Sequence, residues 1–130
     1  MQMNECLRLA ATGHTQDMVA NNFFSHTGSN GSTMEDRICR AYGEPKIYGK
    51  LGENCGRPKL FEGPEFAKIA VMRNIVDEGV PGRGHRLNIY DKDYRYVGIH
   101  MRWDDNYEGY LDTFNFSSVD LQPQQRRELK

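Results

Sequence analysis

The sequence predicts one α+β domain in which helices cover a small antiparallel sheet. Its 130 residues suit a single domain of average size. Apolar residues recur at helical spacing in the first part of the chain, and they alternate with polar residues near its C-terminal end. Helices that come first and a hairpin that comes last are typical of the α+β class.

Composition narrows the possible partners. Lys and Arg number 17 and Asp and Glu number 18, so the net charge of −1 gives no field for holding nucleic acid, and no such partner is expected. No apolar run approaches the roughly 18 residues of a membrane span, so no transmembrane segment is expected. Cys6, Cys39 and Cys55 lack metal-binding spacing. In an oxidising compartment Cys39 and Cys55 are the expected pair, and three buried free thiols are the alternative.

Two helices are predicted in the first third of the chain. A stretch of about residues 3–22 without proline carries apolar-face residues at steps of three and four: Leu7, Ala10, Ala11, His14 and Met18. On that face His14 is expected to be a packed, hydrogen-bonded histidine rather than a ligand. Ser32 or Thr33 can cap a second helix that runs to about Ala41.

The middle of the chain is predicted to be a long loop followed by a third helix. Glycines and prolines are dense over residues 43–64, and loops of that length usually carry function or are disordered. Helical spacing returns from Phe66 to Glu78 and ends at a run of turn residues, 79–82. Because a two-stranded hairpin is only marginally stable, a third strand is expected within residues 43–56, around residues 47–49.

A hairpin is predicted near the C-terminal end. Val97, Ile99, Met101 and Trp103 alternate with other residues along one strand, and the return strand alternates in the same way from Tyr110 to Phe116. We expect the domain to occupy residues 1–120 and residues 121–130 to form a polar tail.

Four segments hold most of the reactive side chains, and each lies on a predicted loop or at a helix end. They contain His26, Glu53, Asp77, Glu78 and His85. Imidazole and carboxylate groups brought together could bind a divalent metal ion. Without a metal, a histidine beside a glutamate could act as a base on water or form a charge-assisted hydrogen bond. The alternative is that these groups are unrelated surface and capping residues.

Four sequence blocks, in order, give the chain a resemblance to a known family. They are residues 14–32 (HTQDMVANNFFSHTGSNGS), 36–38 (DRI), 52–54 (GEN) and 82–89 (GRGHRLNI). Together they resemble the CAP superfamily of SCP-like proteins, which includes cysteine-rich secretory, antigen 5 and pathogenesis-related proteins. The likeness covers about residues 3–117 and is closest to compact microbial-type members.

The resemblance implies an α-β-α sandwich with a shallow cavity lined by two histidines and two acidic residues. Carried over by motif, these are His26, Glu53, His85 and Glu78, with Asp77 as the substitute for Glu78. Some relatives hold zinc or another divalent ion there, and others bind sterols or lipids elsewhere or act through protein contacts. The family pattern also has a secretory signal and a further helix before residue 3. Neither is found here, so we expect a truncated chain whose parent protein is extracellular. The alternative is a complete chain in which a partner fills the uncovered flank of the sandwich.

Three functions follow from these residues. The leading hypothesis is a non-enzymatic binding or defence module whose cavity binds a divalent metal ion, such as zinc. The second is a hydrolase in which a metal-bound or histidine-activated water attacks a peptide or ester. The third is an interaction module that holds no metal and binds a partner through exposed aromatics such as Tyr107 and Tyr110. The oligomeric state stays open.

Overall fold

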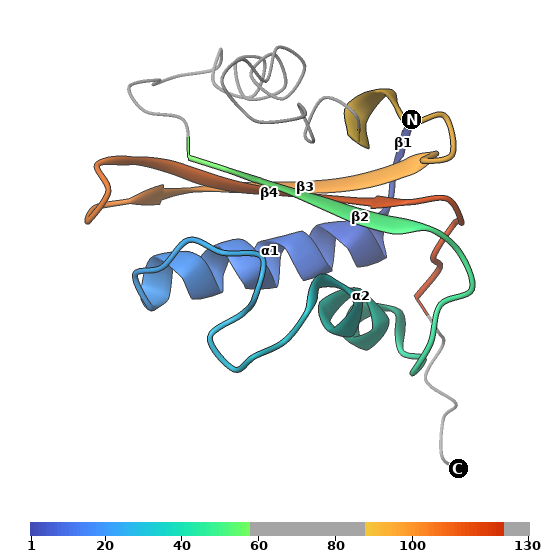
Figure 1. The fold of residues 1–130 in the computed structure, drawn as a ribbon, viewed down its shortest axis with the longest axis horizontal. Coiled ribbons are helices and arrows are strands. Elements are labelled where there is room, and N and C mark those ends of the chain that lie inside the picture. Colours follow the sequence, from blue (N-terminus) through green and yellow to red (C-terminus); the bar gives the residue numbers. More distant parts are fainter. Residues whose placement is uncertain (58–87, 124–130) are drawn as a thin grey trace.

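A four-stranded sheet in the order β1-β3-β4-β2 forms the centre of the computed structural model, which describes residues 1–57 and 88–123 (Figure 1). Its strands are β1 (Gln2–Met3), β2 (Leu51–Gly56), β3 (Tyr96–Asp104) and β4 (Gly109–Ser117). The predicted hairpin is confirmed as the antiparallel pair β3 and β4, and β2 adds to β4 antiparallel. Because β1 pairs with β3 in parallel, the sheet is mixed. The α+β class is confirmed.

The first predicted helix is α1 (Glu5–Ala20). Asn4 caps it, because the side chain of Asn4 accepts the Leu7 N–H at 3.1 Å. The helix ends at Asn21, whose N–H donates to the carbonyl of Asp17. The prediction of residues 3–22 is therefore right to within about two residues at each end.

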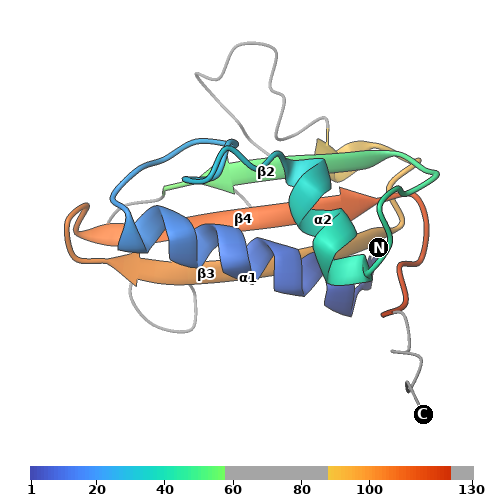
Figure 2. The same ribbon diagram turned by 90° about the horizontal axis from the view of Figure 1, so that it is seen from below.

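The second predicted helix is α2 (Met34–Tyr42), and Thr33 is its cap. Thr33 and Asp36 form a reciprocal capping box, in which each side chain accepts the backbone N–H of the other residue. The helix ends at Gly43, whose φ of 92° places it in the left-handed region that favours glycine. Both helices lie on the same face of the sheet, and α2 packs beside the N-terminal half of α1 (Figure 2).

The third strand lies within the predicted segment 43–56, but several residues after the predicted centre at 47–49. The strand lies at β2, whereas Ile47 instead packs among the apolar side chains between α1 and α2. Its sequence, LGENCG, has none of the β-branched residues that mark a strand, so pairing with β4 overrides a weak local preference. Gly52 fits because the ring of Tyr94 fills the space that a Cβ would take.

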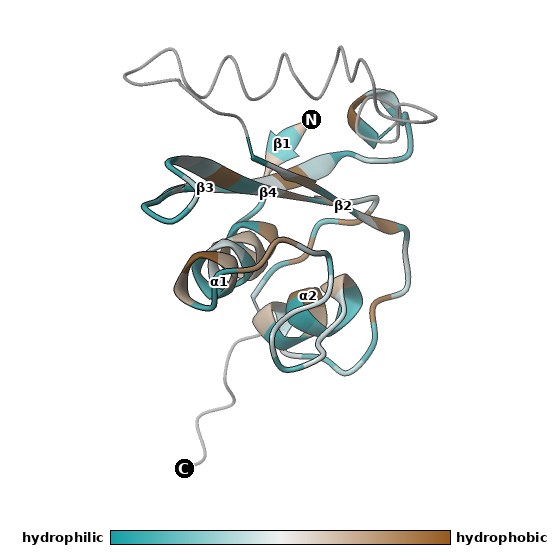
Figure 3. Cartoon of the chain, turned by 60° about the vertical axis from the view of Figure 1, so that its left-hand side comes forward, coloured by the Kyte–Doolittle hydropathy of each residue, from teal (hydrophilic) through white to brown (hydrophobic). Residues whose placement is uncertain are grey.

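Apolar side chains form two clusters on opposite faces of the sheet. One joins α1 and α2 and contains Leu7, Ile38 and the buried Leu121. The other lies on the far face and contains Tyr94, Val97, Phe114 and Phe116. Figure 3 shows the two helices side by side beneath the sheet, each with apolar and polar segments. Neither described helix has the length and apolar character that a membrane span needs.

The third predicted helix lies outside the described residues, and so do Asp77, Glu78 and His85. The same holds for residues 124–130 of the expected tail.

Gly98 allows α1 to lie directly against β3. A Cβ at this position would meet two backbone atoms of α1, Arg8 N at 2.0 Å and Leu7 C at 2.2 Å. We expect Gly98→Ala to lower the free energy of unfolding by about 2–3 kcal/mol, measured by urea denaturation, because backbone cannot move aside cheaply. Gly13→Ala is the matched control, since nothing lies within 4 Å of a Cβ there. It should stabilise the protein by about 0.5–1 kcal/mol, and equal effects of the two variants would contradict this packing.

Candidate functional site

Glu53 is a charged residue buried between the sheet and the helices. It lies on β2, and its side chain is 2% exposed. Arg37 of α2 donates from one guanidinium nitrogen to both carboxylate oxygens, at 3.0 and 2.9 Å. His26 donates from Nδ1 to Oε1 at 2.9 Å. A carboxylate in such a place needs partners of this kind, because an unpaired buried charge is strongly destabilising.

Arg37 connects three segments that are far apart in the sequence. Its side chain is 10% exposed. Besides Glu53 it reaches the backbone carbonyl of His26 at 2.8 Å and that of Ser32 at 2.9 Å. One guanidinium therefore joins β2, α2 and the loop between the two helices, which carries His26.

Two further side chains donate to Glu53. The amide of Asn115, on β4, fits its neighbours when its oxygen accepts the Ala11 N–H and its nitrogen donates to Glu53 Oε2 at 2.8 Å. The thiol of Cys55 donates to Oε1 at 3.5 Å. The carboxylate thus accepts from four side chains, and it offers about four lone-pair positions. Glu53 therefore has no position left for a further ligand unless one of these donors leaves.

His26 is hydrogen-bonded to Glu53 through one ring nitrogen, and much of its side chain is exposed. Because Nδ1 gives its hydrogen to Glu53, the neutral ring carries its lone pair on Nε2. The side chain is 62% exposed, and within the described part of the chain no group is hydrogen-bonded to Nε2. A histidine fixed by a carboxylate at one nitrogen and open at the other can bind a metal ion or accept a proton.

The pKa values of His26 and Glu53 shift in the directions expected for a histidine that donates to a buried carboxylate. The hydrogen bond to Glu53 raises the pKa of His26 above its usual value, against the opposing effects of burial and of the Arg37 charge. Burial acts to raise the pKa of Glu53, but the hydrogen bond from His26 and the charge and hydrogen bonds of Arg37 outweigh it and leave that pKa below its usual value. Glu53 is therefore ionised at neutral pH.

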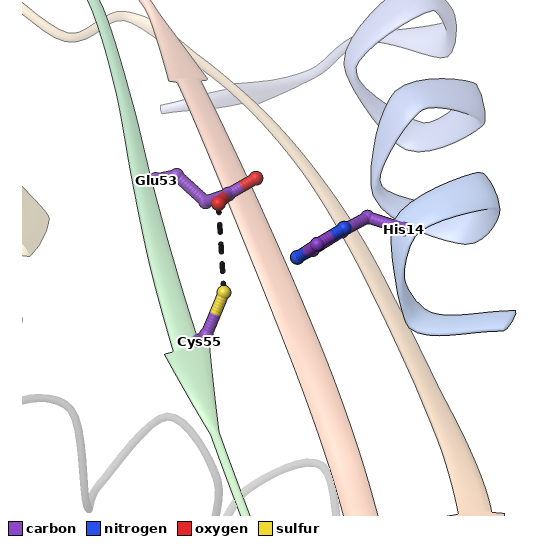
Figure 4. A group of neighbouring side chains, drawn as sticks. All are labelled: His14, Glu53 and Cys55. Carbon is purple, nitrogen blue, oxygen red and sulfur yellow. Dashed lines mark hydrogen bonds between the residues drawn. The ribbon is translucent and has the colours of Figure 1, made fainter. Parts of the chain in front are cut away.

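His14, Glu53 and Cys55 form a buried cluster whose ligand atoms all lie within 4.8 Å of one another, close enough to hold a metal ion (Figure 4). His14 is hydrogen-bonded through Nε2 to the carbonyl of Ser25 at 2.6 Å, which confirms the prediction of a packed histidine. Burial lowers its pKa and raises the pKa of the Cys55 thiol far above the usual range. A metal ion here would have to remove the thiol proton and compete with Arg37 for Glu53.

The disulfide expected in an oxidising compartment is not formed. Cys6, Cys39 and Cys55 are free and buried, as in the alternative. Cys39 packs in the apolar cluster between the helices, whereas Cys55 lies on β2 beside Glu53.

The structure brings together two of the side chains expected at the site, His26 and Glu53. Sequence reasoning missed Arg37 and Asn115, which hold the carboxylate. Arg37 gave no local signal, because a charged residue next to a buried one is common in an amphipathic helix. Asn115 gave none either, because asparagine in a strand has many uses.

Comparisons with known proteins agree with the resemblance found in the sequence. A model of the cysteine-rich secretory protein family, CAP, matches residues 1–116. The uncharacterized membrane protein YlbC of Bacillus subtilis is 27% identical over 89 residues, which are 68% of this chain and 22% of that protein. The chain therefore spans less than a quarter of the length of that relative.

Two solved structures share the fold. One is an extracellular protein containing a SCP domain from Bacillus anthracis, with a TM-score of 0.64 and 23% identity over 90% of this chain and 33% of that one. The other is an outer surface protein from Borrelia burgdorferi, with a TM-score of 0.65 and 14% identity over 90% of this chain and 76% of that one. At these identities the likeness shows the fold alone.

The coupling between Arg37 and Glu53 can be measured with a double-mutant cycle. Arg37→Met leaves a buried carboxylate without its main counter-charge, so we expect it to lower the free energy of unfolding by about 3–5 kcal/mol. In Arg37→Met/Glu53→Gln that charge is gone, and the double variant should lose at least about 1 kcal/mol less than the sum of the single variants. Urea denaturation gives all four values.

The exposed pair Arg8 and Glu5 on α1 supplies the matched control cycle. Arg8→Met and Glu5→Gln should show a coupling of about 0.5 kcal/mol or less, as exposed pairs do. A coupling for Arg37 and Glu53 no larger than this would contradict their role as a buried pair.

Proposed function

The chain belongs to the cysteine-rich secretory protein family, CAP, and from that membership we propose that it is a non-enzymatic binding module that takes up a divalent metal ion at His26. The observation that carries the proposal is the hydrogen bond from His26 Nδ1 to Glu53, which leaves the lone pair of the neutral ring on Nε2. Histidines that ligate metals usually donate their other ring hydrogen in this way. Zinc, which accepts imidazole nitrogen readily, is the ion that we propose first.

The residues have separate roles in this proposal. His26 binds the ion through Nε2, while Glu53 orients the ring instead of binding the metal, because its oxygens are already occupied. In this proposal Glu53 positions His26, whereas the family resemblance implies that Glu53 is itself a ligand. The family resemblance supplies the remaining ligands, His85 and Glu78, with Asp77 as the substitute for Glu78.

We also propose that the module works outside the cell. One structural neighbour is described as extracellular and the other as an outer surface protein, which supports secretion. Burial of all three thiols shields them from oxidants, as an extracellular setting would require. The partner would be a protein, a lipid or a sterol.

Calorimetric titration with zinc tests the metal site. His26→Ala should weaken binding at least tenfold, and Glu53→Gln, checked for folding by circular dichroism, should weaken it about 10- to 100-fold. Affinity should fall from pH 7 to pH 5 as the imidazole is protonated. The control is His100→Gln, which replaces a half-buried histidine on β3 and should keep full affinity for zinc.

Two outcomes would contradict the assignment of the metal to His26. One is equal zinc uptake by the wild-type protein and His26→Ala. The other is loss of uptake in Cys55→Ser while His26→Ala still binds, which would move the ion to the cluster of His14, Glu53 and Cys55.

A hydrolase is the second candidate, because a carboxylate that fixes Nδ1 also prepares Nε2 to take a proton from an attacking water. Only the neutral imidazole can do so, and its neutral fraction grows as pH rises through the pKa. Since Glu53 raises the pKa of His26, turnover of p-nitrophenyl acetate or casein should increase with pH, with a midpoint above about 6.5. His26→Ala should abolish this turnover. Absence of turnover in the wild-type protein would reject the hydrolase.

A further inference from the structure

A cavity of about 440 Å³ lies on the helical side of the protein, between α1, the loop at residues 29–32 and α2. This is within the range of sites for small ligands. It adjoins the candidate site, because His14 and Arg37 line it as well. The helices and the loop between them can be followed in Figures 2 and 3.

One wall of the cavity is apolar and open. Leu9, Ala10, Gly13 and Ala41 form it. Leu9 is 46% exposed although it is a large apolar residue. Gly13 lies inside α1, where glycine costs about 1 kcal/mol relative to alanine, and no atom lies within 4 Å of a Cβ placed there. Packing within the described chain therefore gives no reason for this glycine, whereas a ligand that lies against the helix would.

The polar wall offers donors, while its main acceptors are already used. The carboxylate of Asp17 accepts from Ser29, through both N–H and hydroxyl, and from Asn21. The amide oxygen of Asn30 accepts the Ser32 N–H. A ligand that met this wall would therefore find few free acceptors.

Arg40 is the positively charged residue of this wall that is available to a ligand. It is exposed, and among the described residues it makes no ion pair. Asp36, one turn earlier in α2, feels the charge of Arg40 but uses its carboxylate to accept the Thr33 N–H. In the same wall Nε of Arg37 is buried and finds no acceptor among the described groups.

We propose that this cavity binds a small organic carboxylate, with the carboxylate on Arg40 and an apolar body against Leu9, Gly13 and Ala41. A guanidinium matches a carboxylate in charge and in the spacing of its donors. The apolar body of the ligand would cover the apolar wall, and the removal of both surfaces from water would favour binding. This inference does not depend on metal binding at His26.

N-acetyl-leucine and N-acetyl-leucinamide are matched probes, because they differ only in the carboxylate. Titrations followed by amide ¹H–¹⁵N shifts should show saturable changes in α1, residues 29–32 and α2 with N-acetyl-leucine. The amide should bind about tenfold more weakly, as expected for loss of a charge-assisted hydrogen bond. Arg40→Gln should weaken the binding of N-acetyl-leucine by about the same factor. Arg102→Gln, which replaces an exposed arginine on β3, should leave that binding unchanged.

A Cβ placed at Gly13 meets no atom within 4 Å. Gly13→Leu, checked for folding by circular dichroism, should therefore fill the cavity and abolish binding of both probes. Equal affinity for acid and amide, or unchanged binding by Arg40→Gln, would overturn the role of Arg40. Undiminished binding by Gly13→Leu, or shifts only at other places in the chain, would overturn the cavity as the site.

Discussion

The pairing of Arg37 with Glu53 is the interaction on which the candidate site depends. A carboxylate that is 2% exposed is tolerated only when it is paired and fully hydrogen-bonded, and the guanidinium meets most of that need. The same guanidinium also holds the carbonyls of His26 and Ser32. Neutralising Glu53 and fixing the loop that carries His26 are therefore one event, which requires α2 to dock against the sheet.

Arg37 also affects the protonation of His26. A buried glutamate with histidine as its only partner would favour the protonated imidazole, because the pair would then be neutral. Arg37 supplies that positive charge instead, and its effect on the pKa of His26 is downward, opposite to the effect of Glu53. The net effect still raises the pKa of His26, because the hydrogen bond to Glu53 is the largest contribution. The neutral imidazole, with its lone pair on Nε2, therefore prevails only above that raised pKa.

Local patterns in the sequence predicted the elements of the fold, whereas the partners within the site required the folded chain. Helical spacing located α1 and α2, Thr33 was one of the two residues predicted to cap α2, and alternation located the hairpin. The position of β2 was predicted only roughly, because its residues have little preference for a strand. His26 and Glu53 were named from the family resemblance, but no local pattern indicated that Arg37 and Asn115 would saturate the carboxylate. Such contacts join residues 16 and 62 positions apart, and only the register and docking of distant segments decide them.

That register is set from the opposite face of the sheet. Phe116 stacks on Tyr94 with ring centroids 5.5 Å apart, and with Phe114 it belongs to the apolar cluster there. Because side chains alternate between faces, Asn115 must then point toward α1, and its partner across β2 is Glu53. A slip of one residue would turn Glu53 into the apolar cluster, away from Arg37, at a large energetic penalty. The aromatic packing on one face thus enforces the charged arrangement on the other.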